Sequence, residues 1–145
     1  MLENNVLIVG GGHAGVEAAM ALSRMKVCCS IITLDKEAVG RLSCNPAIGG
    51  LAKSHLVKEI DALGGIMGVA ADFCAIQFKT LNKTKGRAVW ATRAQVDKKK
   101  YPIYINSLIN KNKYIKIIED EATEIICKNN QIKGLKLKKH GSVSS

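Results

Sequence analysis

The hydrophobic pattern of the first 35 residues predicts a strand, a helix and a second strand. Val6–Val9 is an uninterrupted apolar run, which is typical of a strand buried on both faces. The alanine-rich stretch over 16–22 has helical character, and the β-branched, mostly apolar run over 29–34 predicts the next strand. Together these segments form one βαβ unit, whose two strands run parallel in one sheet.

The rest of the chain alternates between helical and strand patterns. Two helices are expected over 51–63 and 66–75, followed by a β-hairpin with strands over 76–81 and 87–92. A long helix over 94–111 and three short strands over 114–118, 123–128 and 131–138 complete the chain. Residues 35–50 are rich in Gly, Ser, Asn and Pro and predict a loop. Pro102 should kink the long helix or break it near Lys100, because proline removes a helical hydrogen bond.

A glycine turn joins the first strand to the first helix. Gly10, Gly12 and Gly15 have the GxGxxG spacing, and a buried strand before them and a helix after them favour a dinucleotide site over a plain tight turn. Gly10 allows the sharp turn, Gly12 lets the backbone approach a pyrophosphate, and Gly15 lets helix and strand pack closely. The N-terminus of the helix then faces the anion and binds it through main-chain N–H groups.

The end of the second strand is where dinucleotide-binding folds place an acid that binds the ribose. Asp35 lies 20 residues beyond Gly15, which fits this rule, while Thr33 occupies the alternative position on the same face of the strand. No arginine follows directly, which disfavours NADP. We interpret His13, inside the glycine turn, as a spacer that contacts the cofactor rather than as a general base.

Composition and cysteine usage narrow the class of protein. With 145 residues, 47% hydrophobic and 23% charged, the chain has the size and composition of one globular domain. The first apolar run is too short for a signal peptide or a membrane span, so we expect a cytoplasmic protein without a membrane partner. Five cysteines without a CxxC pair support neither a disulfide framework nor a zinc site, and no metal is expected.

The net charge of +10 is unevenly distributed. Eight of the 22 lysines and arginines lie between Lys79 and Lys100, with Asp97 as the single acid in that range, so the predicted hairpin over about 76–93 is strongly basic. Concentrated positive charge favours a phosphate-rich partner such as nucleic acid through counterion release. Solvated lysines of a lysine-rich chain explain the same charge, and the charge alone leaves both interpretations open.

Cys44 is the candidate reactive group. It lies in a polar, glycine-flanked loop shortly before a predicted helix, where the helix dipole stabilises a thiolate. A small packed thiol is the alternative, and the residues by themselves do not choose between the two.

Five segments carry a resemblance to the glucose-inhibited division protein A family, the FAD-binding subunit of the tRNA uridine 5-carboxymethylaminomethyl modification enzyme. They are residues 9–15, 43–50, 55–65, 76–78 and 91–95. The string Ser-Cys-Asn-Pro-Ala-Ile-Gly-Gly over 43–50 is the most specific of them. Where the family has Gly-Lys-Gly, this chain has Ala52, Lys53 and Ser54.

The resemblance implies a fold and a site. The fold is α/β, a Rossmann-like FAD-binding domain with a parallel sheet and a small antiparallel hairpin element, of which residues 1–145 form the N-terminal part. The residues implied to hold the FAD pyrophosphate are Gly10, Gly11, Gly12, His13, Ala14 and Gly15. Cys44 matches the family's functional cysteine beside the flavin, and Ala122 matches the position whose backbone contacts adenine.

The resemblance also implies an activity. The family adds a carboxymethylaminomethyl group at C5 of the wobble uridine of tRNA, with FAD, NADH and methylenetetrahydrofolate, as a homodimer with a tRNA-modifying GTPase; the basic hairpin would then bind tRNA phosphates. We expect this chain to be a truncated form, inactive by itself, that binds FAD weakly or not at all. The alternatives are a folate- and FAD-dependent tRNA methyltransferase and a non-catalytic basic module that binds nucleic acid.

Overall fold

The structure is a computed structural model that describes residues 6–43 and 45–145. The chain divides into two compact units. The first comprises Met1–Gly40 and Asn106–Ser145, and the second comprises Arg41–Ile105. Each unit has its own sheets and its own buried residues.

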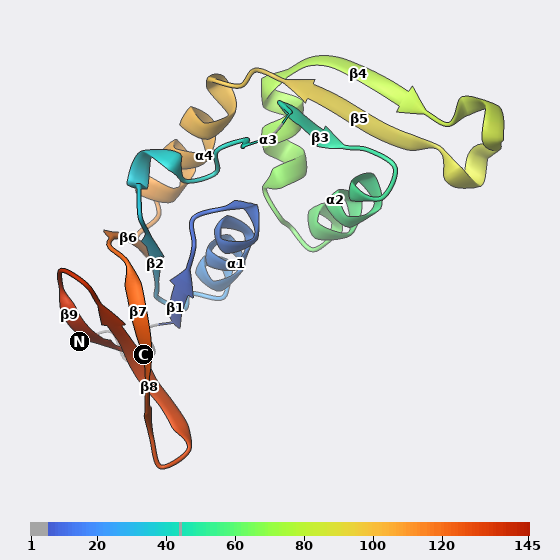
Figure 1. Ribbon diagram of the computed structural model, residues 1–145. Helices are drawn as coiled ribbons and strands as arrows, with labels where there is room; N and C mark the ends of the chain where they lie inside the picture. Colours follow the sequence, from blue (N-terminus) through green and yellow to red (C-terminus); the bar gives the residue numbers. More distant parts are fainter. Residues whose placement is uncertain (1–5, 44) are drawn as a thin grey trace. The chain divides into compact units, whose positions relative to one another are not determined.

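The first unit is built on a three-stranded parallel sheet in the order β1-β2-β6. The strands are β1 (Val6–Val9), β2 (Cys29–Thr33) and β6 (Ile115–Glu119), and Ile8 lies opposite Ile31, which lies opposite Ile117. Helix α1 (His13–Arg24) joins β1 to β2 (Figure 1). The predicted βαβ unit and its parallel strands are therefore confirmed.

The central strand β2 is buried because both faces of the sheet are covered. Cys29 and Ile31 share one face, and the Cys29 thiol lies 4.0 Å from the carbonyl oxygen of Ala19 in α1. On the other face, Ile32 forms a buried cluster with Leu135 and Leu137. These two leucines belong to an antiparallel sheet of β7 (Ala122–Lys128), β8 (Gln131–Leu137) and β9 (Gly141–Ser144). An apolar run without alternation is what a strand covered on both sides requires.

The second unit has an antiparallel sheet in the order β3-β5-β4. Its strands are β3 (Ala47–Gly49), β4 (Ala75–Leu81) and β5 (Ala91–Val96), with helices α2 (Lys53–Ala62) and α3 (Met67–Cys74) between β3 and β4. The β4–β5 hairpin ends in two 3-10 turns, Lys83–Lys85 and Arg87–Val89 (Figure 1). Helix α4 (Lys100–Asn110) follows β5 and contains residues of both units.

The second strand of the hairpin, expected over 87–92, and the helix after it, expected over 94–111, have other bounds in the structure. Ala94–Val96 was expected to begin a helix, but it forms the end of β5, where Ala94 pairs with Phe78 on one side and with Ile48 on the other. Helix α4 begins at Lys100 instead, after Asp97, whose carboxylate accepts hydrogen bonds from the amides of Lys99 and Lys100 at 2.8 and 3.0 Å. Pro102 thus lies in the first turn of α4, where proline is tolerated, rather than inside the helix.

Two strands lie where none was expected. Strand β3 lies within the expected loop over 35–50, which also contains the short 3-10 helix Lys36–Ala38, and β9 lies in the C-terminal tail. Neither has an alternating pattern of useful length, so only pairing with β5 and β8 defines them.

Candidate functional site

The glycine turn after β1 leads directly into the N-terminus of α1, a position where proteins bind anions. Gly10 has φ +105°, in the left-handed region, and its amide donates to the carbonyl of Ile32 at 2.8 Å. Gly12 is the N-cap of α1 and contributes no side-chain cap, and the first amide to bond back to it is that of Val16, at 3.0 Å. The turn therefore leads into the positive end of the helix dipole, where an anion is stabilised.

The glycines of this turn differ in what surrounds them. A Cβ on Gly15 would lie 2.0 Å from the carbonyl oxygen of Gly10, and a Cβ on Gly11 would lie 2.9 Å from a methyl group of Val39. A Cβ on Gly12 would meet nothing within 4 Å, so Gly12 faces open space. Gly15 therefore permits close packing of strand and helix, and Gly12 leaves room for a group outside the chain, as the spacing predicts.

A hollow of about 330 Å³ lies at the carboxyl ends of the three parallel strands. It is lined by Val9 and Gly10 after β1, by residues 32–34 at the end of β2, and by Asp120, Glu121 and Ala122 after β6. Ligands of open α/β sheets bind outside the carboxyl ends of the strands, so this is the place where the fold offers a nucleotide site. The structure brings Ala122 and the glycine turn together at this hollow.

The two candidates for the ribose contact at the end of β2, Thr33 and Asp35, lie in different surroundings. Thr33 lines the hollow, whereas the Asp35 carboxylate accepts the amide of Glu37 at 2.9 Å and caps the 3-10 helix Lys36–Ala38. The Thr33 hydroxyl donates to the carbonyl of Asp35 at 3.2 Å. Of the two candidates for the ribose contact, Thr33 therefore lies at the hollow and Asp35 does not.

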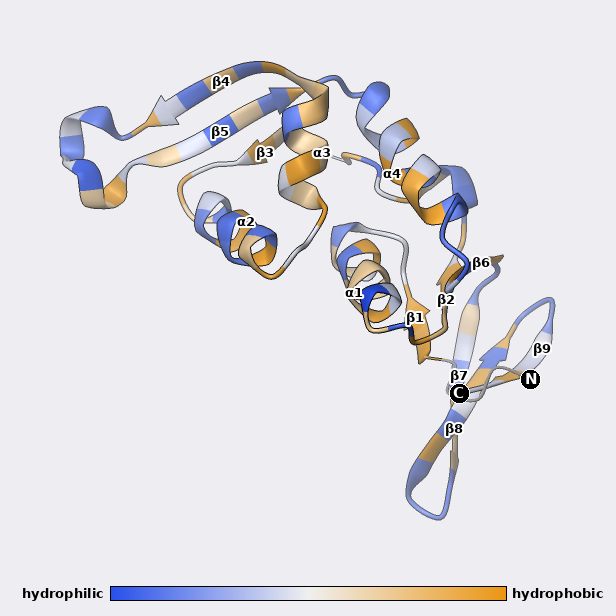
Figure 2. Cartoon of the chain, turned by 180° about the vertical axis from the view of Figure 1, so that it is seen from behind, coloured by the Kyte–Doolittle hydropathy of each residue, from blue (hydrophilic) through white to orange (hydrophobic). Residues whose placement is uncertain are grey.

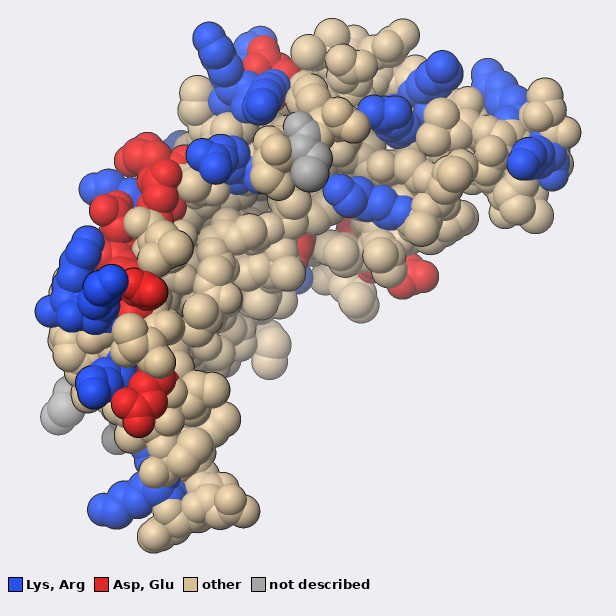
Figure 3. All heavy atoms as spheres, viewed as in Figure 1, with Lys and Arg blue, Asp and Glu red and all other residues tan. Residues whose placement is uncertain are grey.

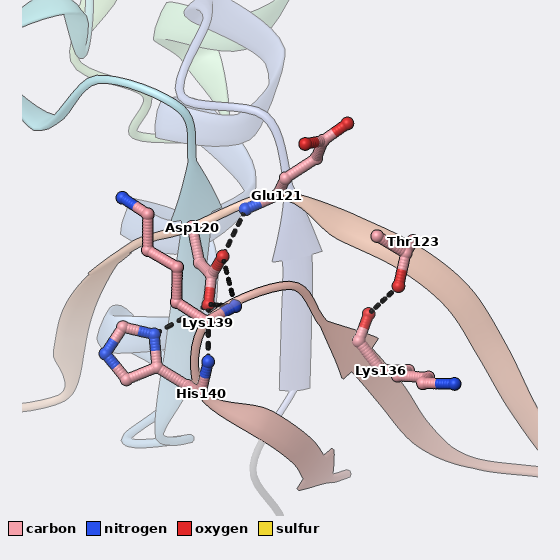
Figure 4. Close-up of polar contacts among 6 residues, drawn as sticks. All are labelled: Asp120, Glu121, Thr123, Lys136, Lys139 and His140. Carbon is pink, nitrogen blue, oxygen red and sulfur yellow. Dashed lines mark hydrogen bonds and ion pairs between the residues drawn. The ribbon is translucent and has the colours of Figure 1, made fainter.

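Asp120, which the sequence analysis did not single out, holds the third side of the hollow in place (Figure 4). Its buried carboxylate accepts hydrogen bonds from the amides of Glu121, Lys139 and His140 at 2.7 to 3.1 Å and lies 2.6 Å from Nδ1 of His140. Burial by itself raises the pKa of the Asp120 carboxyl, but the hydrogen bonds from the His140 ring and from the three amides outweigh it and hold the pKa well below its usual range. The turn between β8 and β9 is thereby fastened beside Ala122. An acid directly after a mostly apolar strand was the available sign in the sequence.

Of the other candidate residues, those that the structure describes do not line this hollow. Cys44 lies outside the described residues. Gly49 and Gly50 belong to the second unit, where Gly49 has φ +91° and a Cβ on it would lie 2.2 Å from the carbonyl oxygen of Thr92. Ala14 and His13 are in the first turn of α1. Whether Ala14 and His13 contact a cofactor stays a prediction.

Two absences concern the described part of the chain alone. Over residues 6–43 and 45–145, no group of His, Cys, Asp and Glu side chains is arranged to hold a metal ion. Over the same residues, no helix has the length and apolar character needed to cross a bilayer.

The second unit carries the basic hairpin. Strands β4 and β5 and the turns between them expose a run of lysines and arginines, and Figure 3 shows blue side chains along this hairpin without red ones among them on the visible face. Figure 2 shows the same outer end as largely hydrophilic. The hairpin itself is confirmed, with β5 ending three residues beyond the expected limit of the basic segment.

The parallel sheet, the glycine turn and the hollow at the strand ends together define the class: an α/β protein with the Rossmann-like fold of FAD-binding domains. Comparison with known proteins gives the family. The family model of glucose inhibited division protein A matches residues 5–145. The chain belongs to this family.

Relatives of known sequence and structure agree with that assignment. The tRNA uridine 5-carboxymethylaminomethyl modification enzyme MnmG of Campylobacter hominis is 50% identical over 135 residues, which are 93% of this chain and 21% of the relative. The corresponding enzyme of Aquifex aeolicus is 48% identical over 134 residues. The crystal structure of Aquifex aeolicus GidA (form II) has a TM-score of 0.92 and 45% identity, covering 99% of this chain and 24% of that one. The chain thus spans about a fifth of the curated relatives that it matches.

A more distant structure shows how widely the fold is used. A probable FAD-dependent monooxygenase from Pseudomonas aeruginosa has a TM-score of 0.67 at 12% identity, over 97% of this chain and 40% of that one. At this identity the likeness concerns the fold alone.

Proposed function

We propose that this chain binds FAD and forms the N-terminal part of the FAD-binding domain of a tRNA-modifying enzyme. The observation that carries the proposal is the turn from Gly10 to Gly15, which leads from the end of β1 into the N-terminus of α1 and has open space at Gly12. The chain's own glycines would hold the diphosphate, and Thr33 and the backbone at Ala122 would contact the ribose and adenine ends in the hollow. FAD supplies the redox chemistry when bound.

The proposed reaction is addition of a carboxymethylaminomethyl group at C5 of the wobble uridine. It is supported by 50% identity to enzymes whose names state this modification, and this identity favours it over the folate-dependent methyltransferase. We further propose methylenetetrahydrofolate as carbon donor, NADH as reductant, a GTPase partner, a homodimer and a cytoplasmic location. The 145 residues alone would not complete the reaction.

Cys44 is proposed as the reactive thiol of this enzyme. Its assignment is supported by the match of residues 43–50 to the family's most specific string. A Cys44→Ser variant of the complete enzyme should retain FAD and lose modification of the wobble uridine. A variant that loses FAD together with activity would instead indicate a packing role for this cysteine.

A titration followed by NMR tests the cofactor site. On a ¹⁵N-labelled chain, FAD and ADP should shift the amide signals of Gly10, Gly12 and Gly15, while Gly64 and Gly86 serve as internal references in the second unit. Riboflavin, which lacks the diphosphate, should leave all five signals in place. Equal shifts with riboflavin, or none at millimolar FAD, would contradict the proposed site. Of the two outcomes expected for the 145 residues alone, weak binding and no binding, we propose weak binding, which this method detects.

A further inference from the structure

The β4–β5 hairpin between Lys79 and Arg93, here called the cationic arm, has positive charge without compensation. Its five cations are Lys79, Lys83, Lys85, Arg87 and Arg93, and residues 79–93 contain no Asp or Glu. None of the five forms an ion pair with a carboxylate in the described part of the chain. All five are exposed, so this charge is available to a partner in solution.

Two of these cations face each other across the hairpin. Lys79 lies directly opposite Arg93 in the antiparallel register, so both side chains emerge on the same face of the sheet. On its other side Arg93 pairs with Gly49, which has no side chain to offer a countercharge. Like charges directly opposite each other destabilise a strand pair. An anion bound between Lys79 and Arg93 would convert this repulsion into attraction for both.

The tip of the arm combines charge with an exposed aromatic ring. Asn82 has φ +59° and donates from its side chain to the carbonyl of Val89 at 3.3 Å, which ties the two sides of the tip together. Beyond it, the guanidinium of Arg87 lies 5.9 Å from the ring centroid of Trp90, which is 39% exposed. Aromatic rings and arginine planes are the surfaces on which unpaired bases stack, while lysines follow the phosphates.

We propose that the cationic arm binds the backbone of the RNA substrate, with a phosphate between Lys79 and Arg93 and an unpaired base on Trp90. This inference rests on the proposed function, from which it takes the identity of the RNA. An anionic membrane would be attracted by the same charge, but insertion needs apolar side chains at the tip. The exposed large apolar side chains of the tip are Val89 and Trp90, whereas residues 83–87 are Lys, Thr, Lys, Gly and Arg, a mostly hydrophilic surface that favours phosphates in water.

Salt-dependent binding provides the first test. Anisotropy of a labelled, unmodified tRNA transcript is measured with the 145-residue chain between 50 and 200 mM salt. The tip variant, with K83Q, K85Q and R87Q, should bind at least tenfold more weakly, and its slope of log K against log salt should be shallower by about 2 to 3. A charge-matched control in the first unit, with K116Q, K128Q and K133Q, should bind within threefold of the wild type.

The single tryptophan of the chain provides a second readout. Since that residue is Trp90, its emission should be quenched by the transcript with the midpoint seen by anisotropy. The pair variant, with K79Q and R93Q, should bind the transcript more weakly and yet melt at a higher temperature, because the cross-strand repulsion is removed. A purely structural role of these two residues would not move binding and stability in opposite directions.

The outcomes separate the arm from the proposed enzyme. The arm would be overturned as an RNA site by equal weakening in the tip and control variants, or by binding without a change in Trp90 emission. It would also be overturned by absence of binding at 50 mM salt, or by preference for vesicles of anionic lipid. A transcript bound equally well by wild type and tip variant would overturn the arm and leave tRNA as substrate. Loss of binding in the tip variant, combined with no response of the glycine amides to FAD, would support the arm and overturn the flavoenzyme.

Discussion

Two alanine substitutions in the glycine turn should separate a ligand contact from a packing contact. In Gly15→Ala the new Cβ would lie 2.0 Å from the carbonyl oxygen of Gly10, whereas real Cβ contacts essentially never fall below 3.0 Å. The turn and the start of α1 must therefore separate by about 1 Å or more. Overpacking of this kind costs about 1–3 kcal/mol. For a chain of this length that corresponds to a loss of about 2–12 °C in Tm, at about 2–4 °C per kcal/mol.

Gly12→Ala should have the opposite profile. Gly12 has φ −73° and ψ −175°, which alanine adopts readily, and its Cβ would meet nothing within 4 Å. The stability should therefore stay within about 1 kcal/mol of the wild type. The added methyl group would stand where we propose that the diphosphate approaches. Loss of one charged hydrogen bond of about 1.5–3 kcal/mol would correspond to roughly 10- to 100-fold weaker FAD binding.

The assay pairs thermal unfolding by circular dichroism with the FAD titration on the same samples. We expect a lower Tm in Gly15→Ala, and weaker FAD binding with an unchanged Tm in Gly12→Ala. FAD bound by Gly12→Ala as tightly as by the wild type would refute the assignment of this turn to the diphosphate. An unchanged Tm in Gly15→Ala would refute the packing argument.

Two further substitutions address buried polar groups. Ser54→Ala should raise the free energy of unfolding by about 1–2 kcal/mol, because the Ser54 hydroxyl is buried without a hydrogen-bond partner among the described residues and alanine favours the helix; a lower urea midpoint would contradict this. Asp120→Asn should lower the Tm at neutral pH. Because the folded-state pKa of Asp120 is lowered, its contribution to stability is complete above the unfolded pKa of about 3.9 and is lost as the pH falls further. The Tm difference between wild type and variant should therefore shrink from pH 5 to pH 2. A constant difference would count against the charge as its cause.

The part of the fold that the sequence predicts well is the part held together by neighbours in the chain. Strand β1, the glycine turn, α1 and β2 follow one another within 28 residues. Each has its own local signal: an apolar run for the two strands, the glycine spacing for the turn and an alanine-rich composition for the helix. The hollow itself is not predicted, because its third side follows β6, and the parallel pairing of β6 with β2 has no signal in the sequence. The position at the end of a strand points to Thr33 or Asp35, and the family resemblance points to Ala122. The structure adds that Asp35 caps the turn at Glu37 while Thr33 lines the hollow.

The features that the sequence did not predict depend on pairing between distant segments. Residues 94–96 have no preference strong enough to exclude a helix, and their strand exists because β3 and β4 flank them on both sides. Strand β9 is a polar segment that pairs only with β8. Asp120 looks like an ordinary surface acid until the β8–β9 turn places two further amides and a histidine around it.

The two proposed phosphate sites use different physics, and salt should distinguish them. The stretch from Val6 to Leu22 contains no lysine or arginine, so a diphosphate at the glycine turn would be held by short hydrogen bonds and by the dipole of α1. The cationic arm would act through five exposed charges that release counterions from RNA. Between 50 and 200 mM salt we therefore expect FAD affinity to change less than threefold and tRNA affinity to fall by at least tenfold. A steep salt dependence of FAD binding would show that cations outside the turn hold the diphosphate, and the main-chain site would then have to be abandoned.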